Sequence, residues 1–145
     1  MLFLQPLEES VSSYSTFSEE SLLLAKRWLE GCTSYSTCMQ ATVPWYPTRL
    51  LDLGSENSEQ TDSIHPVHTK ELALNKPYIT LSHRRARGAF LRLTRESLQS
   101  FYHAIPATDL PKSFREAVIV SRILAARYLW TDSLCIVQDE SDLSD

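Results

Sequence analysis

The chain has 145 residues, 43% of them hydrophobic and 22% charged, which suits one globular domain with a buried core. Its formal net charge of −4 argues against general nucleic-acid binding by the whole chain. With only 3 glycines, no glycine-rich phosphate-binding loop is present.

The 3 cysteines and the N-terminus indicate the compartment. An odd number of cysteines gives no disulfide framework, and Cys135 lies in an apolar run typical of a buried thiol. The apolar run at the N-terminus is too short for a secretory signal, and no stretch approaches the roughly 20 apolar residues of a membrane span. We therefore expect a soluble, cytoplasmic protein.

The first half of the chain predicts a helix and one short strand. After a loose, polar segment, Ser18 can cap a helix whose first turn holds two glutamates, with Gly31 as its end. Residues 49–53 form a strand candidate that ends at Gly54. Residues 55–70 are polar and are interpreted as a connecting loop.

The second half predicts alternating strands and helices. Residues 78–82 are β-branched and aromatic, which favours a buried strand. Thr94 can cap a helix that runs to His103, and Pro111 stands at the start of the next one. The apolar positions of that next helix are Phe114, Ala117, Val118, Ser121 and Ala125. Residues 128–131 and 134–137 supply one strand or two, so the order of elements predicts an α/β fold with a small parallel sheet flanked by helices.

Two phrases near the C-terminus resemble a known family. Residues 110–117 read LPKSFREA and residues 127–139 read RYLWTDSLCIVQD, and both are similar to the HET (heterokaryon incompatibility) domain of filamentous fungi. The earlier run YITLSH at residues 78–83 resembles a further block of that family. The resemblance implies three parts: a loose segment at 1–18, a helix, strand and linker over 19–77, and a partial HET domain at 78–145.

The resemblance also implies a function. HET domains act in fungal non-self recognition and programmed cell death, so we expect partners among other incompatibility or signalling proteins, or self-association, and neither nucleic acid nor membrane. The family is distantly similar to the flavodoxin-like TIR fold. This implies an alternative, hydrolysis of NAD or another nucleotide, with NAD as the ligand.

Three departures from the family pattern predict a truncated or degenerate member without turnover. Arg84, Arg85 and Ala86 stand where the family has Cys-Trp-Gly. Glu116 replaces an aspartate. The chain stops at Asp145, although the family continues beyond this block, so the fold is expected to be incomplete at its C-terminus.

Two strand ends carry the candidate catalytic residues. Asp132 can serve a ligand site at the end of a strand, or can cap a backbone amide in an Asx turn with Ser133. His83 can be a general base or a hydrogen-bonding turn histidine. Glu116 would be the carboxylate of a TIR-like hydrolase, or a charge that favours the start of its helix.

The candidate ligand-binding residues adjoin these positions and are Ser82, Arg84, Arg85 and Ser133. Arginines cluster here, and they either bind a phosphate such as that of NAD or belong to a solvated loop. Zinc binding by Cys32, Cys38, His65 and His68 is not favoured, because their spacings are not those of a zinc finger. We therefore predict no metal site.

Overall fold

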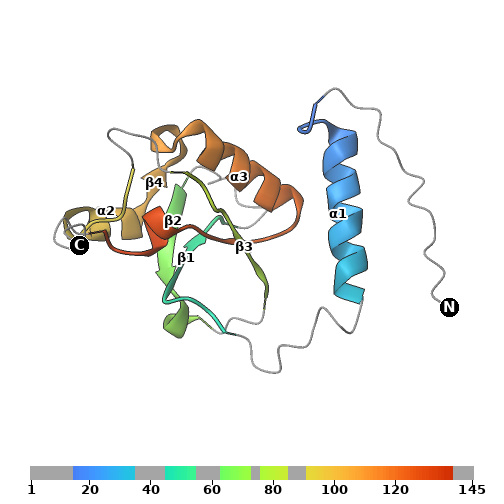
Figure 1. Ribbon diagram of the computed structural model, residues 1–145. Helices are drawn as coiled ribbons and strands as arrows, with labels where there is room; N and C mark the ends of the chain where they lie inside the picture. Colours follow the sequence, from blue (N-terminus) through green and yellow to red (C-terminus); the bar gives the residue numbers. More distant parts are fainter. Residues whose placement is uncertain (1–14, 35–44, 55–62, 73–75, 85–90, 139–145) are drawn as a thin grey trace. The chain divides into compact units, whose positions relative to one another are not determined.

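The computed structural model describes residues 15–34, 45–54, 63–72, 76–84 and 91–138 (Figure 1). The chain divides into two compact units, residues 1–42 and residues 43–145. The described part of the first unit is essentially one helix. The described part of the second unit holds a five-stranded sheet and three α-helices.

The helix of the first unit, α1, spans Glu19–Ser34. Its predicted cap is confirmed, because the Ser21 N–H donates to Ser18 Oγ over 3.2 Å. The predicted end at Gly31 is wrong, and the helix continues to Ser34. A Cβ at Gly31 would meet no atom within 4 Å, so this glycine lies in open surroundings, where a helix tolerates it at a cost of about 1 kcal/mol.

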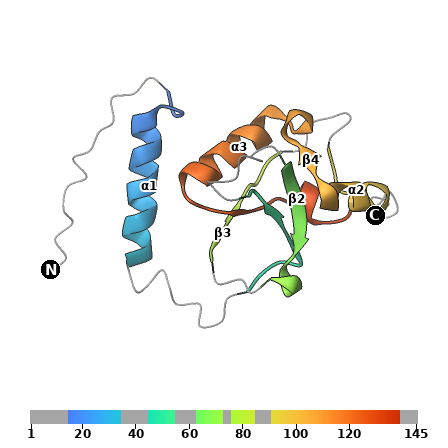
Figure 2. The ribbon, with the colours of Figure 1, turned by 180° about the vertical axis from the view of Figure 1, so that it is seen from behind.

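The sheet of the second unit has the strand order β3-β5-β1-β2-β4. These strands are β1 (Arg49–Asp52), β2 (Ser63–His68), β3 (Tyr78–Thr80), β4 (Ile105–Pro106) and β5 (Tyr128–Trp130). Strand β3 lies toward the viewer in Figure 1, and β2 lies toward the viewer in Figure 2. The predicted α/β class is confirmed.

The predicted parallel arrangement needs correction, because the sheet is mixed and mostly antiparallel. Only β3 and β5 run parallel, with Tyr78 opposite Tyr128. Strand β1 is antiparallel to both β2 and β5, and β2 is antiparallel to β4. A flavodoxin-like or TIR-like sheet is built from parallel strands, so the described sheet is not clearly of that type.

Two strand predictions also need correction. The expected loop at residues 55–70 contains β2, which pairs with β1 along Arg49–Asp52 and places Pro66 opposite Leu51. The loop was expected because the segment is polar, whereas pairing with β1 decides for a strand. The strand at residue 78 exists, but it is a half-buried edge strand and not a buried one.

The helices of the second unit are α2 (Arg95–His103), α3 (Lys112–Ile123) and the short α4 (Asp132–Cys135). The predicted cap of α2 is confirmed, since Thr94 Oγ1 accepts from the Ser97 N–H and Ser97 Oγ accepts from the Thr94 N–H. Helix α3 begins after Pro111 as expected. Ala125, expected in its apolar stripe, lies beyond the helix end with a positive φ of 57°. The expected strand at 134–137 is wrong, because α4 occupies residues up to Cys135.

One hydrophobic cluster joins the helices to the sheet. Helix α3 contacts β5, α4 contacts β1, and α2 contacts both β2 and β4. The buried residues of this cluster are Leu51, Leu53, Ile64, Ile105, Leu110, Phe114, Val118, Leu129, Leu134 and Cys135. Leu51 and Leu129 are register partners and therefore share one face of the sheet, which is the face that the cluster covers.

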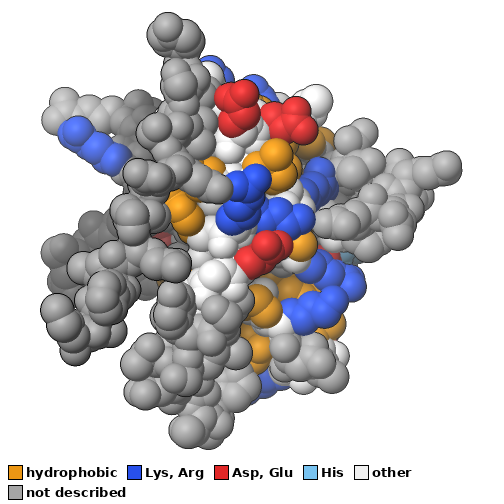
Figure 3. Space-filling view, turned by 90° about the vertical axis from the view of Figure 1, so that its right-hand side faces the viewer, with side chains coloured by type: hydrophobic (Ala, Val, Ile, Leu, Met, Phe, Trp, Pro, Cys, Tyr) orange, Lys and Arg blue, Asp and Glu red, His pale blue; other side chains and the backbone are white. Residues whose placement is uncertain are grey.

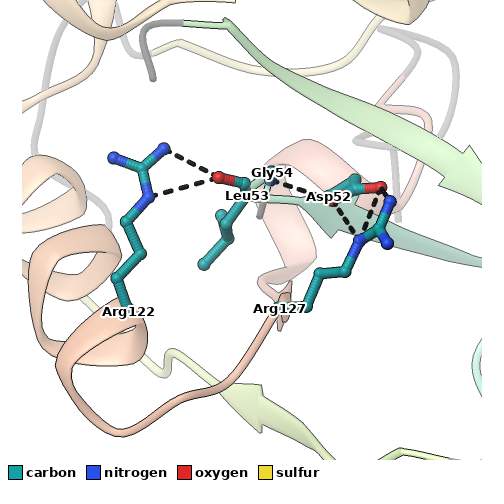
Figure 4. Close-up of polar contacts among 5 residues, drawn as sticks. All are labelled: Asp52, Leu53, Gly54, Arg122 and Arg127. Atoms are coloured by element: carbon teal, nitrogen blue, oxygen red, sulfur yellow. Dashed lines mark hydrogen bonds and ion pairs between the residues drawn. The ribbon is translucent and has the colours of Figure 1, made fainter. Parts of the chain in front are cut away.

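Two arginines fix the end of β1 (Figure 4). Arg127, just before β5, forms an ion pair with the buried Asp52. Arg122 of α3 donates to the Leu53 carbonyl from Nε over 3.2 Å and from Nη2 over 2.8 Å. The α3–β5 connection is thereby tied to the strand on which it packs.

The described helices include none with the length and apolar character needed to cross a membrane.

Candidate functional site

The parallel pair β3 and β5 ends at one edge of the sheet, and a surface cavity lies at that edge. Thr80 is opposite Trp130, and the Leu81 N–H donates to the Trp130 carbonyl over 2.8 Å, so the pairing extends one residue past β3. The cavity has a volume of about 360 Å³ and is lined by Thr80, Leu81, Ser82, His83, Trp130 and Asp132. Ligands of α/β proteins commonly bind outside the carboxyl ends of parallel strands, which makes this cavity the candidate site.

His83 occupies the inner wall of the cavity. Its side chain is only 11% exposed, and its Nδ1 lies 3.9 Å from Asp132 Oδ1 and 3.5 Å from Thr131 Oγ1. Its ring meets the Phe114 ring edge to face, with centroids 4.8 Å apart and planes at 74°. The imidazole is thus oriented by α3 on one side and faces a carboxylate and a hydroxyl on the other.

Asp132 is the first residue of α4 and is 38% exposed. Its Oδ1 accepts from the N–H of the adjacent Ser133 over 2.7 Å, whereas an Asx turn would reach the amide two residues on. The same carboxylate borders the cavity beside His83. The capping contact and a position at the cavity are therefore compatible in one residue.

The positions of His83 and Asp132 determine which chemistry the cavity can support. The His83–Asp132 separation is that of an ion pair when the imidazole is protonated, and it is longer than a hydrogen bond. An imidazole and a carboxylate at one cavity can accept a proton or hydrogen-bond a polar ligand. The exposed Ser82, which also lines the cavity, adds a hydroxyl donor and acceptor at its rim.

Of the remaining predicted residues, those that the structure describes do not line the cavity. Glu116 is 52% exposed on α3 and pairs with Lys112 over 3.7 Å. Ser133 is 1% exposed, and its carbonyl accepts from the Leu93 N–H over 2.7 Å, so it lies in the packed interior. Arg84 is exposed just after His83, and Arg85 lies outside the described residues.

The expected arginine cluster is only partly described. Arg92 and Arg95 are described, whereas the residues between Arg84 and Leu91 are not. In the face shown in Figure 3, the described Lys and Arg side chains lie next to Asp, Glu and apolar ones. Within the described ranges, no three His, Cys, Asp or Glu side chains gather as a metal site, and Cys38 falls outside these ranges.

Sequence reasoning did not name Thr80 and Leu81 of the cavity wall as site residues, and it missed three further residues. Trp130 forms part of the cavity wall, Thr131 is fully buried beside His83, and Phe114 packs on the imidazole. Trp130 and Thr131 immediately precede Asp132, so their position was a usable signal. The contact between Phe114 and His83 joins α3 to the segment after β3, and no local sequence pattern predicts it.

Comparison with known proteins relates the C-terminal part of the chain, which contains the cavity, to a protein family. Residues 78–145 match the family model described as Heterokaryon incompatibility protein (HET). Searches of curated proteins and of solved structures gave no significant match. The matched segment contains β3, β5 and α4, and hence every residue that lines the cavity. The resemblance read from the sequence motifs is therefore confirmed: residues 78–145, slightly less than half of the chain, match the model of that family.

Proposed function

We propose that this chain acts in heterokaryon-incompatibility signalling, as a cytoplasmic component of fungal non-self recognition that promotes programmed cell death. The proposal rests on the match of residues 78–145 to the HET family. We also propose that the cavity beside His83 and Asp132 is the site through which the chain engages its signal.

One observation supports the choice of this cavity. Two of the three sequence blocks that carry the family resemblance meet at the cavity, YITLSH at residues 78–83 and RYLWTDSLCIVQD at residues 127–139. The first block forms β3 and the segment to His83, and the second forms β5 and α4. The two blocks supply all six lining residues of the cavity, so the family motifs converge on one place.

Partner binding is part of the proposal. Asp132 and Ser82 reach the surface at the cavity, and a partner protein or a second copy of the chain can meet them without opening the core. Because the described contacts of His83 tie it to Thr131 and Phe114, changes at the cavity would be transmitted first to α3 and β5.

The test is expression of the whole chain from an inducible promoter in a filamentous fungus, with dead cells counted by a vital dye. We expect the parent chain to kill cells and Asp132→Asn to reduce killing, because the amide keeps the size and the capping oxygen but removes the charge. Glu116→Gln, which changes an exposed side chain on α3, is the matched control and should kill cells as the parent does.

Two results would count against the proposal. Normal viability in cells that contain the intact parent chain at levels visible by immunoblot would refute a role in cell death. Equal killing by the parent and Asp132→Asn, at equal protein levels, would refute the assignment of the cavity.

NAD hydrolysis is not the function we propose, because its basis was a parallel, TIR-like sheet. The purified chain incubated with NAD is expected to release no nicotinamide. Release of nicotinamide that Asp132→Asn abolishes would reverse this conclusion.

A further inference from the structure

We propose that a second cavity, which Trp130 also lines, binds a small aromatic carboxylate. This cavity has a volume of about 440 Å³ and lies between the start of β1 and the end of β5. Its lining residues are Trp45, Pro47, Thr48, Arg49, Trp130, Cys135, Ile136 and Val137. The proposal is independent of the role in cell death.

The walls of this cavity favour a flat, apolar ring. Two of its lining residues are tryptophans, and prolyl, isoleucyl and valyl side chains complete most of the wall. Trp45 is 75% exposed and Ile136 is 48% exposed, so large apolar surfaces stand open to water at this place. Covering them with an aromatic ring removes that surface from water, and stacked or edge-on ring contacts add to the gain.

Among the described residues that line the cavity, Arg49 supplies the only charge. Its Nε is buried and has no hydrogen-bond acceptor in the described parts of the chain. Its register partner on β2 is His68, whose Nδ1 is also buried without a described hydrogen-bond partner. Buried nitrogen atoms are nearly always hydrogen-bonded in native proteins, so the Nε of Arg49, the one of the two residues that lines the cavity, indicates that an acceptor is to be supplied there.

The chemistry of the lining selects a carboxylate as that acceptor. An arginine guanidinium binds a planar carboxylate through two parallel N–H···O bonds. Cys135, the other polar group at depth, stays a neutral thiol because burial raises its pKa to about 11. The lining therefore offers one cation, no anion and an aromatic wall, which complements a ring that carries a single negative charge.

The chemistry leaves two sources for this ligand, a free small molecule or the carboxyl terminus of a peptide that ends in an aromatic residue. We propose the free molecule, because the volume of about 440 Å³ is that of a small-molecule site. Binding of a peptide that ends in an aromatic residue is tested separately.

Binding can be followed on the whole, ¹⁵N-labelled chain through the indole N–H signals of its 3 tryptophans. The probe is indole-3-acetate, with indole-3-acetamide as the uncharged analogue and acetate as the analogue without a ring. We expect the acid to shift the Trp45 and Trp130 signals in a saturable manner, with the amide and acetate at least about tenfold weaker. Trp28, 58% exposed on α1, is the internal control and should not move with them.

Variants separate the two contributions. Arg49→Met keeps the length and apolar stem of the side chain and is expected to weaken binding by about ten- to a hundredfold. Arg49→Lys keeps the charge but lacks the planar guanidinium, so its affinity for the acid should lie between those of the parent and Arg49→Met. Trp45→Ala removes a mostly exposed ring, leaves the fold intact and should also weaken binding, whereas Trp28→Ala should not.

The same titration can overturn the proposal. Equal affinity for the acid and the amide, or unchanged binding by Trp45→Ala, would refute it even if the Arg49 variants failed to fold. No shift of either cavity tryptophan at millimolar probe would refute it outright. Tighter binding of Gly-Gly-Trp than of indole-3-acetate, lost in the peptide amide, would replace the free molecule by a peptide end.

Discussion

Asp52 and Arg127 form a two-pronged ion pair at the junction of β1 and β5, with 2.7 Å between Arg127 Nη2 and Asp52 Oδ2 and 3.0 Å between Nε and Oδ1 (Figure 4). The Gly54 N–H donates to the same carboxylate over 2.9 Å. Asp52 is 5% exposed, so these hydrogen bonds replace those to water that its carboxylate loses on folding. Gly54 has a positive φ of 79°, which lets the chain turn back to the carboxylate.

The pKa of Asp52 is lowered as a result of opposing effects. Burial raises it, but the hydrogen bonds from Arg127 and Gly54, together with the charges of Arg127 and His65, outweigh burial. A carboxylate with a lower pKa in the folded state contributes stability above its unfolded pKa of about 3.9. This contribution is lost as the pH falls through the folded pKa.

We therefore expect Asp52→Asn to lower the free energy of unfolding at pH 7 by about 1.5–3 kcal/mol, toward the lower figure because Arg127 is 48% exposed. The difference should begin to shrink below the unfolded pKa of about 3.9 and should vanish only once the pH has fallen through the lower folded pKa. Urea unfolding followed by circular dichroism at pH 7 and at a series of pH values from about 4 down to about 2 measures this course. Asp109→Asn, at an exposed site, is the control, and a difference that persisted at low pH would contradict this account.

The end of α3 predicts a stabilising substitution. Ala125 has a φ of 57°, the Ala125 N–H donates to the Arg122 carbonyl over 2.9 Å, and the Ala126 N–H donates to the Ser121 carbonyl over 2.9 Å. This is a helix-ending motif that usually holds glycine, because a side chain at positive φ is strained by about 1 kcal/mol. Ala125→Gly should raise the free energy of unfolding by about 0.5–1 kcal/mol.

Ala117→Gly, in the middle of the same helix, provides the control of opposite sign. It should lower the free energy of unfolding by about 1 kcal/mol, since glycine has no conformational advantage there. Thermal melts of both variants beside the parent give the comparison. Destabilisation by Ala125→Gly would show that the left-handed residue is not under strain.

Cysteine reactivity distinguishes the buried thiol from the exposed one. Cys32 is exposed and Cys135 is buried, and burial raises the Cys135 pKa to about 11. At pH 8 on the order of one part in a thousand of such a thiol is ionised, so it should react with DTNB at least about a hundredfold more slowly than an ordinary cysteine. Its rate should rise with pH toward 11, and it should become fast in urea.

A Cys38→Ser background leaves Cys32 and Cys135, so two phases should appear in the folded chain and one in urea. Addition of Cys32→Ser should remove the fast phase alone. Rapid reaction of Cys135 in the folded double variant would contradict its burial.

Short-range features of the second unit were predictable from the sequence. The Thr94 cap of α2 and the start of α3 after Pro111 depend on residues no more than a few positions apart. The positive φ at Gly54 is likewise a local property. The motif blocks that carry the family resemblance could also be read directly, because a long run of uncommon residues is specific without any structure.

Long-range features of the second unit could not be predicted from the sequence. Residues 55–70 were interpreted as a loop because they are polar, yet pairing with β1 stabilises strand β2 within them. Residues 134–137 are an apolar run that suits a strand or a buried helix equally, and packing of Leu134 and Cys135 into the cluster decided for α4. The direction of each strand depends on partners such as Asp52 and Tyr128, which are far apart in the chain.

The same division applies to the candidate site. The sequence by itself determined that His83 and Asp132 follow strands, because the strand residues before each are locally recognisable. Only the tertiary structure decided that these two strands are parallel neighbours, that Nδ1 and Oδ1 lie 3.9 Å apart, and that Phe114 orients the imidazole. Local conformation is set by a residue and its nearest neighbours, whereas the meeting of distant side chains is set by which surfaces bury the most apolar area together.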